Sequence, residues 1–200
     1  MKVHNGMRPQ DILILMYILA KSKIEGVWSK PIDHQEISED EKKLYRMNIS
    51  TPNNKGISRE LEISESEVSE SLYRSAYAGL VEDVKLKKIN KRALLDFVLC
   101  GLKYVFPAHP GAIGRGIPTA HSAQPLKEKI VSDENYIWEH PNGTMRGQII
   151  KPLFNSVPFV VENSQNLYEL MSLIDGIRTG SPRIVSLATE MLEKRINNSW

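Results

Sequence analysis

The first strong pattern along the chain is an apolar stretch near the N-terminus. Pro9 suits the first position of a helix, and Asp11 places a negative charge near the positive end of the helix dipole. The apolar residues that follow fall on nearly every side of a helix drawn through residues 9–23: Ile12, Leu13, Leu15, Met16, Ile18 and Leu19. We therefore predict that this helix is buried against its own domain and also offers a surface to a second subunit.

Residues 57–81 carry the pattern of two short helices joined by a tight turn. Residues 57–61 fit one helix, and Ser64 can cap the next because its hydroxyl accepts hydrogen bonds from backbone N–H groups. Gly79 is a natural stop for this second helix, which we expect over residues 65–78. Its inward stripe at helical spacing consists of Val68, Leu72, Ser75 and Ala76.

The chain after this helix pair predicts a strand, a further helix and then a break. Residues 84–86 alternate like a short strand, and Asn90 can cap a helix over residues 91–105. Cys100, the only cysteine, lies in an apolar run of that helix, so we expect a buried thiol. Proline and glycine recur through residues 107–118 and predict a long irregular stretch between two domains.

The last third of the chain predicts a β-hairpin and two helices. Residues 136–139 and 145–150 flank the pair Asn142 and Gly143, which favours a tight turn between strands. The two helices are expected over residues 165–177, capped by Ser164, and over residues 182–196, with Pro182 at the first position.

The pair of helices in residues 57–81 resembles the winged helix-turn-helix regulators of the MarR type. The run from Ile63 to Leu72 and the segment from Ala78 to Val81 carry the likeness. Residues 101–107 and 114–123 are similar to segments of uncharacterised bacterial proteins described as MarR-like, which extends the resemblance further along the chain. A glutamate, Glu62, stands where such regulators have the glycine of the turn.

These observations predict a mainly α chain with small β elements, of class α+β, in two domains. The first is a winged helix-turn-helix domain over residues 1–106, with a polar insertion at about 25–54 that contains a short surface helix near 39–47. The second, residues 107–200, holds the hairpin and the two helices and is expected to serve dimerisation, sensing or interaction.

The resemblance implies that the outer face of the second helix reads bases in the major groove of DNA. The residues expected on that face are Ser66, Glu67, Ser69, Glu70, Tyr73 and Arg74. The helix is acidic, however, with Glu65, Glu67 and Glu70 against a single Arg74. Such a helix repels phosphate unless a glutamate accepts a hydrogen bond from a cytosine amino group.

A basic segment follows directly and offsets this acidity. No acidic residue interrupts the series Lys85, Lys87, Lys88, Lys91 and Arg92. In a winged helix this segment forms the wing and the start of the next helix, beside the phosphate backbone. A continuous basic face that includes Arg59 and Arg74 would favour DNA binding, whereas an isolated basic spot would favour contact with a protein.

Bulk properties leave the class of partner open. The formal net charge of +2 and the pI near 8.5 neither require nor exclude nucleic acid. The apolar stretch over residues 12–20 is far shorter than the roughly 20 residues that cross a bilayer, so we expect a cytoplasmic protein without a membrane partner. A lone cysteine permits no disulfide within the chain.

Other candidate chemistry is sparse. Gly114 and Gly116 lack the strand and helix that a phosphate loop requires, so a structural turn is favoured. His109, His121 and His140 have no metal-ligand spacing. Arg115 and His121 can bind a small anion or pack under the hairpin, and packing is favoured. No catalytic constellation emerges, so we expect no enzyme, no metal and no cofactor, and the residues of any cofactor site stay unknown.

The leading functional hypothesis is a homodimeric, sequence-specific DNA-binding transcription regulator that acts as a repressor. Double-stranded DNA is the expected partner, and two copies would read two half-sites of an inverted repeat. A protein or a small-molecule effector can bind the C-terminal domain. The alternative is a winged-helix module for protein interaction, such as an antitoxin-like partner.

Overall fold

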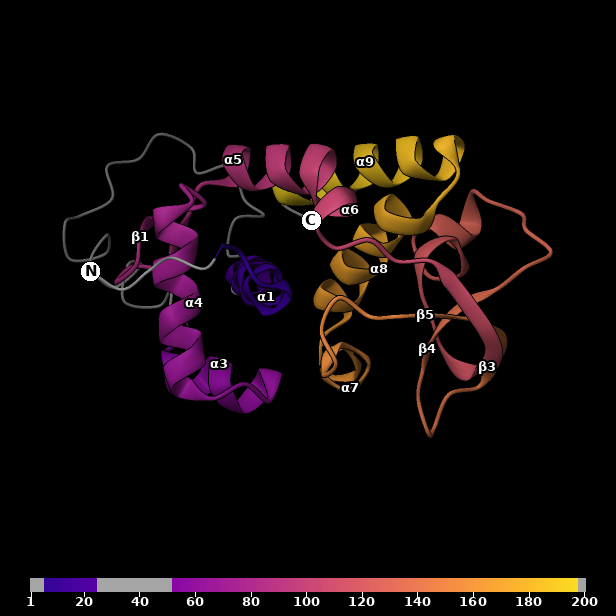
Figure 1. The fold of residues 1–200 in the computed structure, drawn as a ribbon, viewed down its shortest axis with the longest axis horizontal. Helices are drawn as coiled ribbons and strands as arrows, with labels where there is room; N and C mark the ends of the chain where they lie inside the picture. Colours follow the sequence, from indigo (N-terminus) through magenta and orange to yellow (C-terminus); the bar gives the residue numbers. More distant parts are fainter. Residues whose placement is uncertain (1–5, 25–51, 198–200) are drawn as a thin grey trace, which may run out of the picture.

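The computed structural model describes residues 6–24 and 52–197 and combines helices with small sheets (Figure 1). The predicted insertion at 25–54 therefore falls almost wholly outside the described residues, as does its helix near 39–47. The main helices are α1 (Pro9–Ile24), α3 (Asn54–Leu61), α4 (Glu65–Tyr77), α5 (Lys91–Asp96), α6 (Leu102–Val105), α7 (Val157–Val160), α8 (Gln165–Thr179) and α9 (Pro182–Asn197). The strands are β1 (Val81–Asp83), β2 (Lys88–Ile89), β3 (Pro110–Pro118), β4 (Tyr136–Glu139) and β5 (Met145–Ile150).

Helix α1 lies at the centre of the molecule, between α4 and α8 (Figure 1). None of its residues from Ile12 to Ala20 is more than 4% exposed. This burial explains why the helix is apolar all round. The prediction that it offers a surface to a second subunit is wrong, because α8 of the same chain occupies the side left by α4.

The turn between α3 and α4 follows the predicted capping chemistry. Ser64 is the N-cap of α4, and its Oγ accepts from the backbone N–H of Glu67 at 3.3 Å. Glu62 adopts the left-handed conformation, with φ of 56°, and its backbone N–H donates to the carbonyl of Ser58. A residue with a side chain thus takes the conformation that glycine adopts more readily, at a cost of roughly 1–2 kcal/mol.

A short hairpin follows α4 and differs from the predicted strand. Strands β1 and β2 pair in antiparallel fashion, and residues 84–87 form the turn that joins them. The predicted strand over residues 84–86 is therefore wrong. Asp83 explains the turn, since its Oδ1 accepts from the backbone N–H of Leu86 at 2.9 Å.

The predicted helix over residues 91–105 is present but contains a wider turn. Asn90 caps it through a 3.1 Å bond from the N–H of Ala93, and the segment Phe97–Gly101 between α5 and α6 is π-helical. Cys100 is exposed, which corrects the expectation of a buried thiol. Helical spacing accounts for this, because Leu94, Val98 and Leu102 recur every four residues on the buried face, and Cys100 lies on the opposite side.

The segment expected to be irregular is largely strand β3. Strands β3, β4 and β5 form a small closed barrel in which β3 is antiparallel to both others. Gly116 pairs with Glu139 of β4 and with Met145 of β5. The residues of β3 before it pair with β5, and those after it pair with β4. The structural turn expected at Gly114 and Gly116 is consequently wrong.

The predicted β-hairpin in this region is also wrong, because β4 and β5 pair in parallel. The loop between them does not reverse the chain in a hairpin, so β5 runs in the same direction as β4, and both strands are antiparallel to β3. A Cβ atom on Gly143 would lie 2.1 Å from the Cα of Gly116. Glycine is thus required here for the close approach of two backbone segments rather than for a tight hairpin turn.

A buried polar cluster joins the barrel to α8. Asp175 of α8, which is 1% exposed, accepts from Trp138 Nε1 at 2.6 Å and from Thr119 Oγ1 at 3.1 Å. Its other oxygen accepts from Arg178 Nη1 at 2.6 Å. Burial raises the pKa of Asp175, while Arg178, Trp138 and Thr119 act in the opposite direction.

The last two helices agree with the sequence. Ser164 caps α8 by accepting from the N–H of Leu167, and α9 starts at Pro182. The two predicted domains are in contact, because α8 packs on α1 and Ser156 Oγ donates to the carbonyl of Leu61 at 2.8 Å. The division at residue 106 stays a prediction. Within the described ranges, every helix is too short or too polar to span a bilayer.

Candidate nucleic-acid interface

Most of the predicted recognition residues lie on the outer side of α4. Ser66 and Glu70 are exposed, Tyr73 is 65% exposed, and Glu67 and Ser69 are half-buried. Val68 and Leu72 are buried on the other side, as their spacing predicts. These exposed or half-buried residues, Ser66, Ser69, Glu70 and Tyr73, form the outer face of α4.

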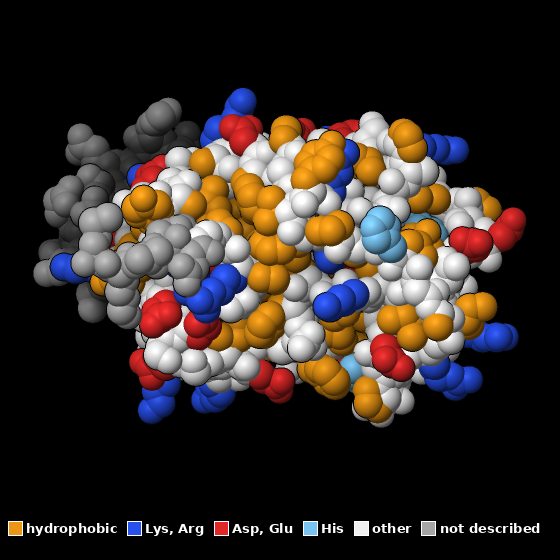
Figure 2. All heavy atoms as spheres, in the orientation of Figure 1, with side chains coloured by type: hydrophobic (Ala, Val, Ile, Leu, Met, Phe, Trp, Pro, Cys, Tyr) orange, Lys and Arg blue, Asp and Glu red, His pale blue; other side chains and the backbone are white. Residues whose placement is uncertain are grey.

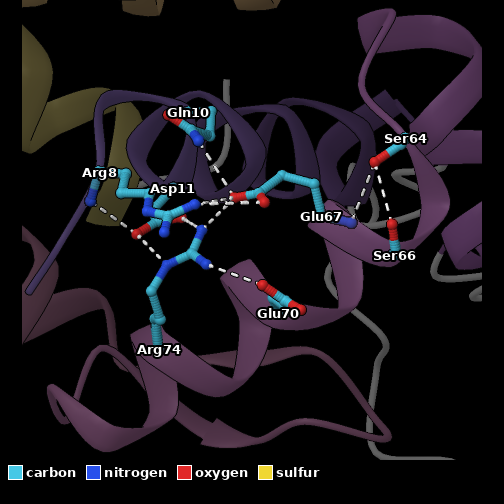
Figure 3. A network of polar contacts seen from close by, with 8 residues as sticks. All are labelled: Arg8, Gln10, Asp11, Ser64, Ser66, Glu67, Glu70 and Arg74. Carbon is cyan, nitrogen blue, oxygen red and sulfur yellow. Dashed lines mark hydrogen bonds and ion pairs between the residues drawn. The ribbon is translucent and has the colours of Figure 1, made fainter. Parts of the chain in front are cut away.

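Arg74 is the exception, because its side chain points into the molecule toward α1. It is only 8% exposed, so its assignment to the recognition face is wrong. Figure 3 shows its guanidinium inside a polar network that joins the start of α1 to the first turns of α4. The carboxylate of Asp11, which is fully buried, accounts for this orientation because a buried charge requires a partner.

The pair of Arg74 and Asp11 has bidentate geometry. Arg74 donates from Nη2 to Asp11 Oδ1 at 2.6 Å and from Nε to Asp11 Oδ2 at 3.1 Å. The backbone N–H of Arg8 donates to the same Oδ2 at 2.8 Å. The hydrogen bond to Asp11, together with that to Glu67, raises the pKa of Arg74, so this guanidinium is charged throughout the accessible pH range.

Glu67 forms the second part of the network. It accepts from Arg74, from Gln10 Nε2 at 3.1 Å and from Arg8 Nη1 at 3.4 Å. Burial opposes ionisation of Glu67, but the hydrogen bonds from Arg74 and Gln10 outweigh it and lower its pKa. Glu70 lies 3.8 Å from Arg74 Nη1 and is thus also held by this guanidinium.

The network changes the electrostatic character of α4. Two of its three glutamates are paired with arginine, but Arg74 also neutralises Asp11, so the negative charge of α4 is only partly offset. The outer face presents the hydroxyl groups of Ser66, Ser69 and Tyr73 together with the exposed carboxylate of Glu70. Sequence reasoning missed this compensation, because Asp11 of α1 and Arg8, which precedes that helix, lie more than fifty residues away in the chain.

The basic segment beside α4 is only partly free of acidic partners. Lys85 and Lys91 are exposed, whereas Lys88 pairs with Glu82 at 2.6 Å and Arg92 pairs with Asp96 at 3.2 Å. Lys87 is half-buried, and burial lowers its pKa. On the face drawn in Figure 2, Lys and Arg side chains are interspersed with acidic and apolar ones rather than forming a continuous basic surface.

Two large side chains, one aromatic and one apolar, add to this region and were not singled out in the sequence. Tyr77 is 73% exposed one turn after Tyr73, and Leu86 is 66% exposed in the turn between β1 and β2. The spacing of Tyr73 and Tyr77 could have identified Tyr77 from the sequence, because residues four apart share a helix face.

The histidines and the second arginine candidate do not form a site together. His121 is buried, stacks against Tyr136 with ring centroids 4.5 Å apart, and bonds to the carbonyl of Glu134 through Nε2. His121 is thus packed as expected, whereas Arg115 is exposed, so the expectation that Arg115 also packs is wrong. Among the described residues, no three His, Cys, Asp or Glu side chains are grouped so as to hold a metal ion.

Comparisons with protein-family models, with curated proteins and with solved structures found no match to this chain.

Proposed function

We propose that this chain is a sequence-specific DNA-binding transcription regulator that inserts α4 into the major groove. The order α1, α3, α4, β1, β2 is that of a winged helix, in which β1 and β2 form the wing. The observation that carries the proposal is the inward orientation of Arg74. It draws Glu67 toward α1 and partly offsets the charge of Glu70, which stays on the outer face beside the hydroxyl groups of that face.

The outer face of α4 suits base edges for a chemical reason. Hydroxyl groups both donate and accept hydrogen bonds, so Ser66 and Ser69 can meet the donor and acceptor patterns of the major groove. Tyr73 adds a hydroxyl and an aromatic surface that fits a thymine methyl group. Lys85 and Lys88 in the adjacent hairpin would lie beside the phosphate backbone and supply affinity without sequence preference.

The matched test of the outer face uses two exposed tyrosines. A duplex selected from a random library by the full chain should bind Tyr73→Ala about tenfold more weakly, because a base contact is lost. Tyr104→Ala removes a tyrosine that is 74% exposed on another surface and should bind like the parent chain. Fluorescence anisotropy with labelled duplex measures both. Equal affinity of the two variants, or no enrichment in the selection, would contradict the proposal.

The wing is tested through the salt dependence of binding. Replacing Lys85 and Lys88 together by alanine should lower the slope of log affinity against log salt by about 1.8, because two phosphate contacts are lost. Replacing the exposed pair Lys127 and Lys129 should leave the slope unchanged. An identical slope in all three proteins would remove the wing from the interface.

A homodimer on an inverted repeat remains part of this proposal, with an interface other than α1. The second candidate function is a protein-interaction module. It is favoured by the exposed Tyr73, Tyr77 and Leu86 and by the burial of Arg74, which leaves no continuous basic face on the side drawn in Figure 2. Aromatic side chains of this kind are enriched in protein interfaces. Failure of the duplex selection, with solubility and fold intact, would favour this second candidate.

A further inference from the structure

Strands β3 and β5 place two arginines directly opposite each other. Arg115 of β3 is the register partner of Arg146 of β5, and both side chains are exposed. Directly opposed residues of an antiparallel pair have Cβ atoms about 5 Å apart, and like charges at such a position destabilise the pairing. The barrel therefore carries a local electrostatic cost at this position.

No acidic group in the described part of the chain relieves this cost. Neither guanidinium forms an ion pair there, whereas Arg74, Arg178 and Arg195 each bind a carboxylate. The two strands themselves supply no carboxylate. The chain has no Asp or Glu between Asp96 and Glu128, which spans β3, and none between Glu139 and Glu162, which spans β5.

The ladder that carries the two arginines is closely packed. Next to them, Gly114 pairs with Gly147, and a Cβ on Gly147 would lie 2.4 Å from the carbonyl oxygen of Asn135. The backbones are thus in contact on the inner side, and the barrel is closed. Arg115 and Arg146 are consequently anchored on a framework that keeps them adjacent in the absence of any ligand.

We propose that Arg115 and Arg146 bind the phosphate group of a small phosphorylated ligand. Two adjacent guanidiniums match a group that carries up to two negative charges and several acceptor oxygens, and each can donate two parallel hydrogen bonds to it. A carboxylate has one negative charge and two oxygens, so it compensates the pair less completely. A bound phosphate would attract both guanidiniums and so offset the repulsion between them.

The site is distinct from the proposed DNA interface. In Figure 1, β3 and β5 lie at the opposite end of the molecule from α4, with α1 and α8 between them. A ligand at the arginine pair therefore does not touch the outer face of α4. Since a phosphate can also belong to a nucleic acid backbone, the experiment includes a duplex.

Pyrophosphate is the probe, and thermal unfolding of the full chain is the first measurement. Pyrophosphate should raise the Tm of the parent chain, since a ligand that binds the folded state stabilises it. Arg115→Gln and Arg146→Gln should each weaken binding by about tenfold and remove most of that rise. Without ligand these variants should have an equal or higher Tm, because the repulsion is relieved.

A double variant at Lys127 and Arg183, with glutamine at both positions, is the matched control, since it removes two exposed cations from other surfaces. It should respond to pyrophosphate like the parent chain. Arg115→Lys with Arg146→Lys keeps both charges but loses the planar donors, and it should bind more weakly than the parent. An equal Tm rise in the arginine variants and the parent, or no rise in the parent, would overturn the proposal.

The duplex separates the two sources of phosphate. If the group belongs to a free ligand, the glutamine variants lose pyrophosphate binding and keep the salt slope of DNA binding. If the group belongs to DNA, a chain that carries both Arg115→Gln and Arg146→Gln lowers that slope by about 1.8. This result supports the phosphate site but overturns the small ligand. Pyrophosphate binding is also independent of Tyr73, so it can succeed where the proposed function fails.

Discussion

Arg74→Ala is expected to destabilise the protein by about 3–5 kcal/mol, because it leaves the carboxylate of Asp11 buried without a counter-charge. Asp11 is fully buried and receives both donors of the arginine fork. After the substitution, the backbone N–H of Arg8 still donates to this carboxylate, but it carries no full positive charge. Urea denaturation followed by circular dichroism measures the loss.

The reverse substitution provides an internal comparison. Asp11→Ala leaves Arg74 with Glu67 and Glu70 as partners, so its cost should be smaller, at about 1–3 kcal/mol. Arg92→Ala removes an arginine from an exposed ion pair and should leave the unfolding midpoint unchanged. Equal midpoints for the Arg74 and Arg92 variants would show that the network does not hold α4 against α1.

The same network makes stability depend on pH in a defined direction. The pKa of Glu67 is lowered from its ordinary value of 4.5, so the folded state binds this proton less tightly than the unfolded state. Its contribution is therefore present above pH 4.5 and is lost as the pH falls through the lowered pKa.

Asp175→Ala is expected to cost a similar amount, about 3–5 kcal/mol, because it leaves Arg178 as an uncompensated buried charge. The side chain of Arg178 is 3% exposed. The substitution also removes the acceptor for Trp138 Nε1 and Thr119 Oγ1, which join the barrel to α8. Unfolding in urea, followed by tryptophan fluorescence, should shift to a lower midpoint.

Two further variants test the cause of this loss. Asp175→Asn keeps an acceptor oxygen but removes the charge. It should lower the free energy of unfolding by less than alanine does, but still lower it, because Arg178 loses its counter-ion. Asp133→Ala changes an exposed aspartate and should have no effect. If Asp175→Ala unfolded at the same urea concentration as Asp133→Ala, the buried cluster would not contribute to the docking of α8 on the barrel.

The local structure of this protein could be predicted from its sequence because short-range interactions decide it. Ser64, Asn90 and Ser164 each accept a bond from an N–H three residues ahead, so each helix start is encoded within four residues. The burial of Val68 and Leu72 followed from helical spacing in the same way. The strand predicted at residues 84–86 is instead the turn between β1 and β2. The position of that turn depends on the single side chain of Asp83.

Long-range contacts decided the features that the pattern could not predict. The direction of Arg74 depends on Asp11, which is 63 residues away in the chain, and no periodicity within α4 contains that partner. The burial of α1 against its own chain depends on α8, so an apolar face alone could not tell an internal neighbour from a second subunit. Likewise, the parallel pairing of β4 with β5 is imposed by β3, which both strands border, rather than by the Asn142 and Gly143 turn between them. The sequence thus determined most of the helices and the caps of three of them. The tertiary structure decided which charges and apolar faces meet, because those energies arise only between segments that folding brings together.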